Sequence, residues 1–163
     1  MRTEIHGIRK WRLLAIIAVI ILVADQLTKQ LVIEFVPFHN GFEIIHGYLD
    51  IVHVKNAGIA FGMMAEAASS PQRVFFILLS LAAMAAIAWI INSSGETDRL
   101  LLVGYSLFFA GALGNLVDRV RFGEVVDFLD IHWGNLHWPA FNVADSALCV
   151  GAGLFLIHVL FKK

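Results

Sequence analysis

The chain contains four long apolar segments, which are separated by more polar stretches. Each apolar segment has about the 20 residues that an α-helix needs to cross the hydrocarbon core of a bilayer. The pattern therefore predicts four transmembrane helices. We expect them at about residues 11–35, 73–92, 99–118 and 139–161.

The two longer polar stretches differ from each other. Residues 37–71 contain glycines that interrupt runs rich in β-branched side chains, such as residues 51–54. Short runs of this kind, bounded by turn residues, are typical of strands, so we expect a small β-rich element outside the hydrocarbon. Residues 119–138 mix aromatic and charged side chains, which predicts a loop at the membrane interface.

Composition agrees with this pattern. Of the 163 residues 59% are hydrophobic and 15% are charged, whereas soluble domains have about 25% charged residues. We therefore predict a single integral membrane domain, residues 1–163, mainly α, built as a four-transmembrane-helix bundle with a small extracytoplasmic β-rich element. Cys149 is the only cysteine, which rules out a disulfide within the chain. Nothing in the pattern indicates nucleic-acid binding.

The basic start of the chain, followed by the apolar run 13–24, could also be a cleavable signal peptide. No small-x-small cleavage site ends this run, and apolar residues resume at Leu31. A first spanning helix therefore explains the segment better than a signal peptide does.

Lysine and arginine near the ends of spans indicate the orientation, because cytoplasmic loops carry more of them. One side would hold Arg2, Arg9, Lys10, Arg12, Arg99, Lys162 and Lys163. The other side would hold Lys55, Arg73, Arg119 and Arg121. We therefore expect both termini in the cytoplasm, and the β-rich element and the aromatic loop on the extracytoplasmic side.

Several costly polar side chains are expected at one depth in the membrane. Counting about 1.5 Å per helical residue places Asp25, Asn115 and Asp145 in the outer third of the bilayer. Ionisable residues inside spans are expensive and usually functional. Lys29 lies one turn after Asp25, and Gly111 one turn before Asn115, on the same helix faces. The coincidence predicts a functional site near the extracytoplasmic surface.

A second carboxylate comes from the loop, where Asp127 is flanked by apolar residues. Two carboxyl groups close together cannot both ionise cheaply, so one of them keeps its proton near neutral pH. The ionised member can activate water, and the protonated member can assist at the attacked carbonyl and the leaving amine. Asp127 and Asp145 are the predicted pair, and a proton-relay or structural role is the alternative. Asn142, three residues before Asp145, is expected to hold it in place.

Simpler interpretations apply to other polar residues. Asp25 with Lys29 could be a structural ion pair, and Asp118 with Arg119 an interfacial one. Cys149 has no nearby histidine and is expected to be a buried small residue. The predicted loop also contains Asp130, His132 and His137, which are residue types that can bind a metal. Their spacing in a flexible loop is only weak evidence for a metal site, so no metal is expected.

Five blocks of sequence resemble the lipoprotein signal peptidase family, also called signal peptidase II. They are residues 25–29 (DQLTK), 56–61 (NAGIAF), 111–119 (GALGNLVDR), 125–128 (VVDF) and 141–146 (FNVADS). One such block would be weak, but the five lie in order across all four predicted spans. None of them departs from the family pattern.

The resemblance implies an aspartic endopeptidase of the bacterial inner membrane that needs no metal or other cofactor. Its substrates would be diacylated prolipoproteins, cut just before the lipid-bearing cysteine to release the signal peptide. Membrane lipids and globomycin-type inhibitors would be further partners. Asp127 and Asp145 would form the catalytic dyad. The residues that line or brace the site would be Asp25, Lys29, Asn56, Gly111, Asn115, Arg119 and Asn142.

Two functions of other classes use similar residues. A proton-coupled membrane transporter could employ the intramembrane aspartates as a proton relay, although no internal repeat is evident. A metal-dependent lipid phosphotransferase also places aspartates near lipid headgroups.

Overall fold

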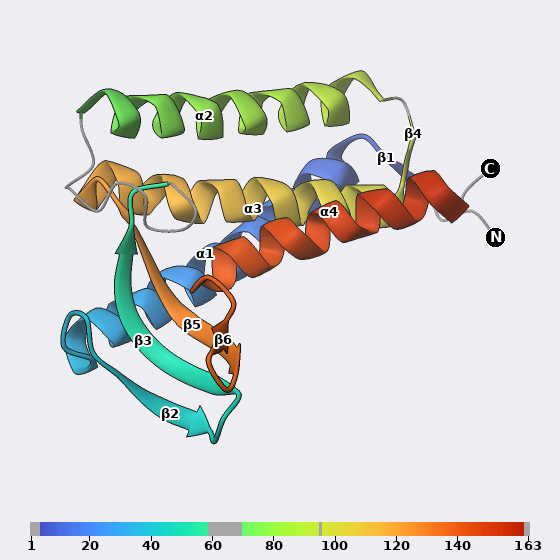
Figure 1. Ribbon diagram of the computed structural model, residues 1–163. Coiled ribbons are helices and arrows are strands. Elements are labelled where there is room, and N and C mark those ends of the chain that lie inside the picture. The colour runs from blue at the N-terminus through green and yellow to red at the C-terminus, as the bar shows by residue number, and fades with distance from the viewer. Residues whose placement is uncertain (1–3, 59–69, 95, 162–163) are drawn as a thin grey trace.

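The structure, a computed structural model, describes residues 4–58, 70–94 and 96–161. Its helices are α1 (Ile8–Phe35), α2 (Ser70–Ser93), α3 (Arg99–Phe122) and α4 (Val143–Phe161). Its strands are β1 (Glu4–His6), β2 (Gly41–Ile45), β3 (Leu49–Asn56), β4 (Glu96–Asp98), β5 (Val125–Trp133) and β6 (Leu136–His137). The helices form an elongated bundle, and the sheet of β2, β3, β5 and β6 projects from one end of it (Figure 1).

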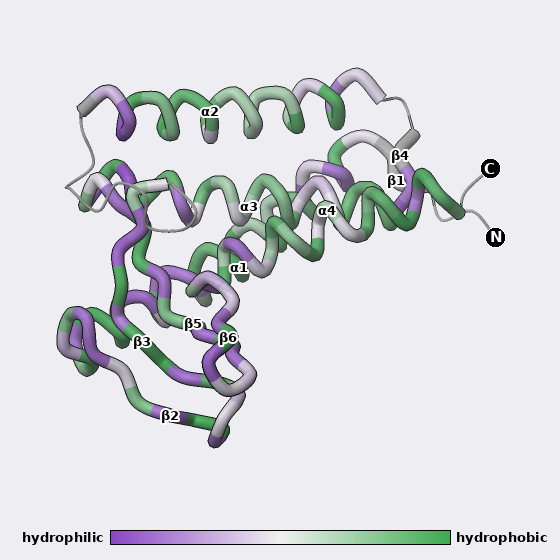
Figure 2. Tube along the Cα trace, viewed as in Figure 1, coloured by the Kyte–Doolittle hydropathy of each residue, from purple (hydrophilic) through white to green (hydrophobic). Residues whose placement is uncertain are grey.

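Within the described residues, four helices are long and apolar enough to cross a membrane, which confirms the expected number of spans. Large apolar side chains such as Val19, Leu78 and Trp89 are exposed on the outside of the bundle. The helices are accordingly mostly green in the hydropathy view, whereas the sheet alternates between colours (Figure 2). Exposed apolar helix surface is expected where lipid, rather than water, is the solvent.

Helix α3 occupies the centre of the bundle and packs against α1, α2 and α4. Its contact with α4 is close because glycines meet at the interface. A Cβ added at Gly104 would lie 3.2 Å from the carbonyl oxygen of Gly151, and one added at Gly151 would lie 2.8 Å from that of Gly104. Inside a membrane the hydrophobic effect does not drive helices together, because lipid tails are as apolar as leucine. Close van der Waals packing at small residues stabilises the contact instead.

Both ends of α3 carry local signals. The Asp98 side chain accepts a hydrogen bond from the backbone N–H of Leu100 at 2.8 Å, so Asp98 caps the helix. Gly123, with φ at 87°, ends the helix in the left-handed conformation that glycine adopts without strain.

The expected loop at residues 119–138 is different in the structure. Helix α3 continues to Phe122, and Val125–Trp133 form strand β5, which pairs antiparallel with β3. The sheet order is β2-β3-β5-β6, so both polar stretches of the chain build one sheet. Helix α4 begins at Val143 rather than near Pro139, because Phe141 still bridges to Leu129 of the sheet. Backbone groups of the expected loop therefore find their partners in a distant segment.

At the opposite end of the bundle, β1 pairs with β4 and ties the start of the chain to the connection between α2 and α3 (Figure 1). Lys10 is buried there, and its Nζ donates hydrogen bonds to the carbonyl oxygens of Ile91, at 2.8 Å, and Ser94. These carbonyls lie at the C-terminal end of α2, where a cation is favourable. Strand β1 and the end of α4 lie at this end, away from the sheet (Figure 1).

Candidate active site

Asp145 lies in the first turn of α4 and is fixed by the residue that caps this helix. The Asn142 side-chain oxygen accepts a hydrogen bond from the backbone N–H of Asp145 at 2.8 Å. In return, the backbone N–H of Asn142 donates to Asp145 Oδ2 at 3.3 Å. This reciprocal arrangement is that of a capping box, which satisfies two helix-end donors and fixes the carboxyl group at the same time.

Asp127 lies on β5, and 2% of it is exposed. Each of its carboxyl oxygens accepts one amide hydrogen bond, Oδ1 from Asn142 Nδ2 at 2.7 Å and Oδ2 from Asn56 Nδ2 at 3.0 Å. Asn56 is oriented in turn by the backbone N–H of Gly58, which donates to its side-chain oxygen at 2.8 Å. The carboxyl group is thus held by side chains from β3 and from the start of α4.

Asn142 connects the two aspartates directly, because its amide nitrogen donates to Asp127 while its amide oxygen accepts from the backbone of Asp145. Burial raises the pKa of Asp127 from 3.8 to about 7, with a further increase from the negative charge of Asp145. Hydrogen bonds from Asn56 and Asn142 and the charge of Lys29 act in the opposite direction. The raised pKa favours the protonated form of Asp127 near neutral pH.

A buried ion cluster lies below the two aspartates. Lys29 Nζ is 2.9 Å from Asp25 Oδ2 and 2.8 Å from Asp118 Oδ2. It also donates to Asn115 Oδ1 at 3.3 Å, and Asn115 Nδ2 donates to Asp145 Oδ1 at 2.7 Å. Charges removed from water are tolerated when they are paired and hydrogen-bonded, as all of these are.

Each acid of this cluster, Asp25 and Asp118, binds the backbone next to one of the paired aspartates. Asp25 Oδ1 accepts a hydrogen bond from the backbone N–H of Ala144 at 2.9 Å, one residue before Asp145. Asp118 Oδ2 accepts one from the backbone N–H of Val126 at 3.1 Å, one residue before Asp127. The cluster therefore fixes the backbone of both segments that carry the paired aspartates.

Two members of this cluster were missed or assigned differently from the sequence. Asp118 is buried and pairs with Lys29, so the interpretation of an interfacial pair with Arg119 is wrong. Gln26 Nε2 donates to Asp25 Oδ2 at 3.1 Å and to Asp118 Oδ1 at 2.9 Å. The signal for Asp118 was its spacing, because it lies one turn after Asn115 on the same helix.

The other residues considered from the sequence have contacts of different kinds. The guanidinium of Arg119 lies over the ring of Phe76, with its carbon 5.1 Å from the ring centre, and Arg119 also donates to the Asn115 carbonyl at 3.4 Å. Cys149 is exposed on the lipid-facing side of α4, so the expectation that it is buried is wrong. The two histidines lie on β5 and β6 rather than in a loop, and each faces its own carboxylate, His137 facing Asp130 at 2.9 Å and His132 facing Asp50 at 3.3 Å. The residues that the structure describes include no group of three or more His, Cys, Asp or Glu side chains placed to hold a metal ion.

Gly111 lets α3 approach the start of α4. A Cβ at this position would lie 2.4 Å from the backbone oxygen of Ala144 and 2.8 Å from Leu148 Cγ. Gly114 is similarly restricted, since its Cβ would lie 2.8 Å from Asp25 Oδ2. Both glycines therefore set the distance between the ion cluster and the segment that carries Asp145.

We predict that Gly111→Ala lowers activity by about 100-fold, because the backbone of Ala144 must move and Asp145 moves with it. The change should also destabilise the protein by about 1–3 kcal/mol, as overpacking does. Gly153→Ala on α4 is the matched control, because a Cβ there meets nothing within 4 Å. Activity assays and thermal unfolding in detergent measure both effects. Equal behaviour of the two variants would contradict the prediction.

The comparison with known proteins agrees with this geometry. A family model described as "Signal peptidase (SPase) II" matches residues 17–161. The chain belongs to the signal peptidase II family. This membership makes it a peptidase, and with its four apolar helices it is a multi-pass bacterial membrane protein. Nothing in the family supports the alternative of a proton-coupled transporter.

Relatives match over nearly their whole length. The "Lipoprotein signal peptidase" of Desulforapulum autotrophicum is 43% identical over 150 residues, which cover 92% of this chain and 93% of that one. The protein of the same name from Syntrophotalea carbinolica is 45% identical over 149 residues, covering 91% of each. A solved structure titled "Bacterial membrane enzyme structure by the in meso method at 1.9 A resolution" is 32% identical. It superposes with a TM-score of 0.83 over 100% of this chain and 99% of that chain.

Proposed function

We propose that this protein is an aspartic endopeptidase that removes signal peptides from diacylglyceryl-modified prolipoproteins by cleaving before the lipidated cysteine. Asp127 and Asp145 are its catalytic dyad in this proposal. The observation that carries it is the single Asn142 side chain that joins two carboxyl groups at the top of α4. Membership of the signal peptidase II family supports the substrate class.

The chemistry needs one proton on the dyad. The ionised carboxyl group takes a proton from water while the water oxygen attacks the carbonyl carbon of the residue before the cysteine. The protonated carboxyl group donates its proton to the carbonyl oxygen as negative charge develops there. The tetrahedral intermediate then collapses and the C–N bond breaks. The cysteine nitrogen leaves with a proton from one carboxyl group, while the other carboxylate takes back the proton of one hydroxyl, which restores the dyad. Because the acids are coupled, the proton belongs to the pair rather than to either residue.

The supporting residues then have distinct tasks. Asn56 and Asn115 each donate to one oxygen of a different aspartate, which orients both carboxyl groups toward the substrate. Asp25 and Lys29 brace the backbone and, through the lysine charge, favour ionisation of the dyad. Arg119, close above Asn115, is placed to line the site at its outer end. No described contact requires a cofactor for these tasks, and none is proposed.

We further propose that both termini are cytoplasmic and that the dyad lies near the extracytoplasmic face of the inner membrane. The greater number of lysines and arginines at the termini supports this orientation. A diacylated cysteine sits at the boundary between headgroups and acyl chains, which is the depth proposed for the dyad. Surrounding membrane lipids would be in direct contact with the substrate, and globomycin-type inhibitors are expected to block cleavage.

The proposal is tested by incubating the purified protein in lipid vesicles with a diacylated prolipoprotein. The expected result is a shorter product whose new N-terminus is the lipidated cysteine, as mass spectrometry can establish. The same prolipoprotein without the lipid is the control and should remain uncut. Absence of cleavage of the diacylated form, in protein that retains its thermal unfolding transition, would overturn the proposal.

The pH dependence follows from the raised pKa of Asp127. Activity requires one proton on the pair, so kcat/KM should fall as pH rises through about 7, where the pair loses that proton. Because the Asn56 hydrogen bond lowers this pKa, Asn56→Ala should move the alkaline limb of the profile to higher pH. Asp130→Asn, three residues along the same strand, should leave the limb in place. A downward shift in Asn56→Ala would contradict this account.

A further inference from the structure

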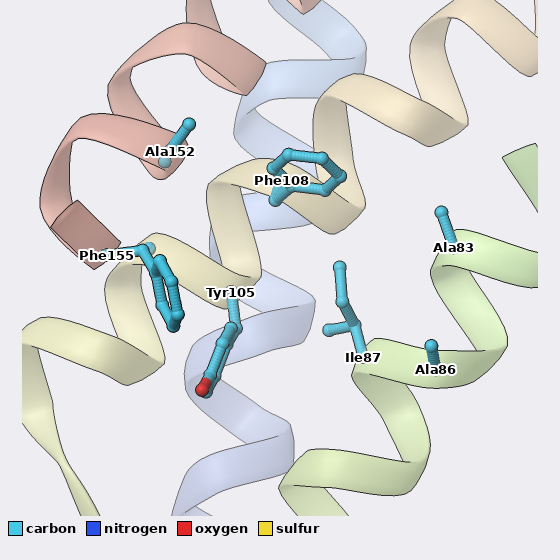
Figure 3. A pocket seen from close by; sticks show the side chains of 9 residues that line it. Ala83, Ala86, Ile87, Tyr105, Phe108, Ala152 and Phe155 are labelled. Atoms are coloured by element: carbon cyan, nitrogen blue, oxygen red, sulfur yellow. The ribbon is translucent and has the colours of Figure 1, made fainter. Parts of the chain in front are cut away.

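A cavity of about 350 Å³ opens between α2, α3 and α4 in the membrane-spanning part of the protein. Its walls are apolar and come from all three helices, with Ala83 and Ile87 from α2, Tyr105 and Phe108 from α3, and Ala152 and Phe155 from α4. Their side chains surround a common space (Figure 3). The space is partly open toward the membrane, and its apolar walls suit an apolar ligand.

The size of the cavity restricts what can occupy it. An α-helix with its side chains is about 10–12 Å across, so even 15 Å of helix needs on the order of 1,000 Å³. This exceeds the 350 Å³ available, so a whole helix does not fit within the cavity. A single unbranched hydrocarbon chain is thin enough, and the apolar walls suit it.

The cavity lies on the same helix faces as the catalytic layer. Phe108 is two helical turns before Asn115 on α3, and Ala152 is two turns after Asp145 on α4. On α2, Ala83 is two turns after Phe76, whose ring lies against Arg119. All three walls of the cavity therefore continue, on one face, into residues at the level of the dyad.

The depth also fits a chain attached at the dyad. Seven helical residues correspond to about 10 Å, and the ten residues from Asp145 to Phe155 to about 15 Å. One leaflet of the hydrocarbon core is about 15 Å thick. The cavity thus covers the deeper part of the leaflet that an acyl chain hanging from the catalytic layer would cross.

We propose that this cavity binds one acyl chain of the diacylglyceryl group on the substrate cysteine. The inference rests on the proposed function and adds the site that recognises the lipid. Small side chains at Ala83 and Ala152 leave the space open, while Phe108 and Phe155 form its walls. Holding the chain here positions the modified cysteine, and hence the bond before it, at the dyad.

The test compares two lipopeptide substrates that differ only in acyl length, one dipalmitoyl and one dihexanoyl, whose chains end above the cavity. Ala83→Phe fills the cavity from α2. It should raise KM for the dipalmitoyl substrate by about tenfold and leave kcat, and KM for the dihexanoyl substrate, unchanged. Ala85→Phe is the matched control, because Ala85 is exposed on the same helix and does not line the cavity. It should behave like the wild type with both substrates.

The outcomes separate the two proposals. Failure of the wild type to cleave either substrate would overturn the proposed function itself. Cleavage by the wild type, with Ala83→Phe unaffected or equally impaired toward both substrates, would overturn only the acyl-chain site.

A second measurement tests the site even if Ala83→Phe does not fold. A dipalmitoyl lipopeptide with a diazirine at the end of one chain is photolysed with the Asp145→Asn protein. Crosslinks at Tyr105, Phe108 or Phe155, reduced by excess unlabelled dipalmitoyl but not dihexanoyl lipopeptide, are expected. Crosslinks confined to outward-facing residues such as Val19 and Trp89 would overturn the site.

Discussion

Replacing Asp127 or Asp145 with asparagine is expected to slow prolipoprotein cleavage by about 1,000-fold or more, the scale of a lost acid–base group. Asparagine has nearly the same volume as aspartate, so packing should change little. It cannot, however, take a proton from water or return one to the leaving amine. Initial rates of product formation from a diacylated prolipoprotein measure the loss.

The double variant distinguishes a dyad from two independent contributions. If the two carboxyl groups act as one unit, Asp127→Asn/Asp145→Asn should be hardly slower than either single variant. Asp130→Asn is the matched control, because Asp130 lies on the same strand and pairs with His137 outside the site. Wild-type rates in either single variant, or losses that multiply in the double variant, would contradict the dyad.

The helical part of the fold could be predicted from the sequence because its signals are local. Continuous apolar length defines a span, and residues three or four apart share a helix face whatever the rest of the chain does. Depth along each helix was therefore enough to bring Asn115 and Asp145 together, and the structure joins them by a hydrogen bond.

Strand β5 could not be predicted because its partners are distant in sequence. Residues 125–133 look like an interfacial loop until β3, about 75 residues earlier, supplies the other side of the ladder. Lys29 was likewise assigned to Asp25 alone, since nothing local shows that Asp118 is its second partner. Cys149 was misplaced because a helix in lipid exposes apolar side chains, and hydrophobicity alone does not show which of its faces is buried.

Lys29→Met is expected to destabilise the protein by about 3–5 kcal/mol, because it leaves Asp25 and Asp118 as uncompensated buried charges. The cluster holds the backbone of Ala144 and Val126, so activity should fall as well. Lys55→Met is the control, because Lys55 is exposed on β3. Unfolding in detergent micelles measures the difference. A Lys29→Met protein as stable as Lys55→Met would contradict the prediction.

Lys29 could act only as part of a structural ion pair, or it could also act on the dyad through its charge. Stability does not distinguish these two roles, but the pH profile does. Adding Asp25→Asn to Lys29→Met removes one unpaired charge and should recover part of the lost stability under either interpretation. The pH profile separates them, because the Lys29 charge lowers the pKa of Asp127. Without that charge, the alkaline limb of kcat/KM should move above its wild-type position near pH 7 in Lys29→Met. The shift should be smaller in the double variant, because Asp25→Asn also removes a nearby negative charge, which acts in the opposite direction. An unmoved limb would leave Lys29 with a bracing role alone.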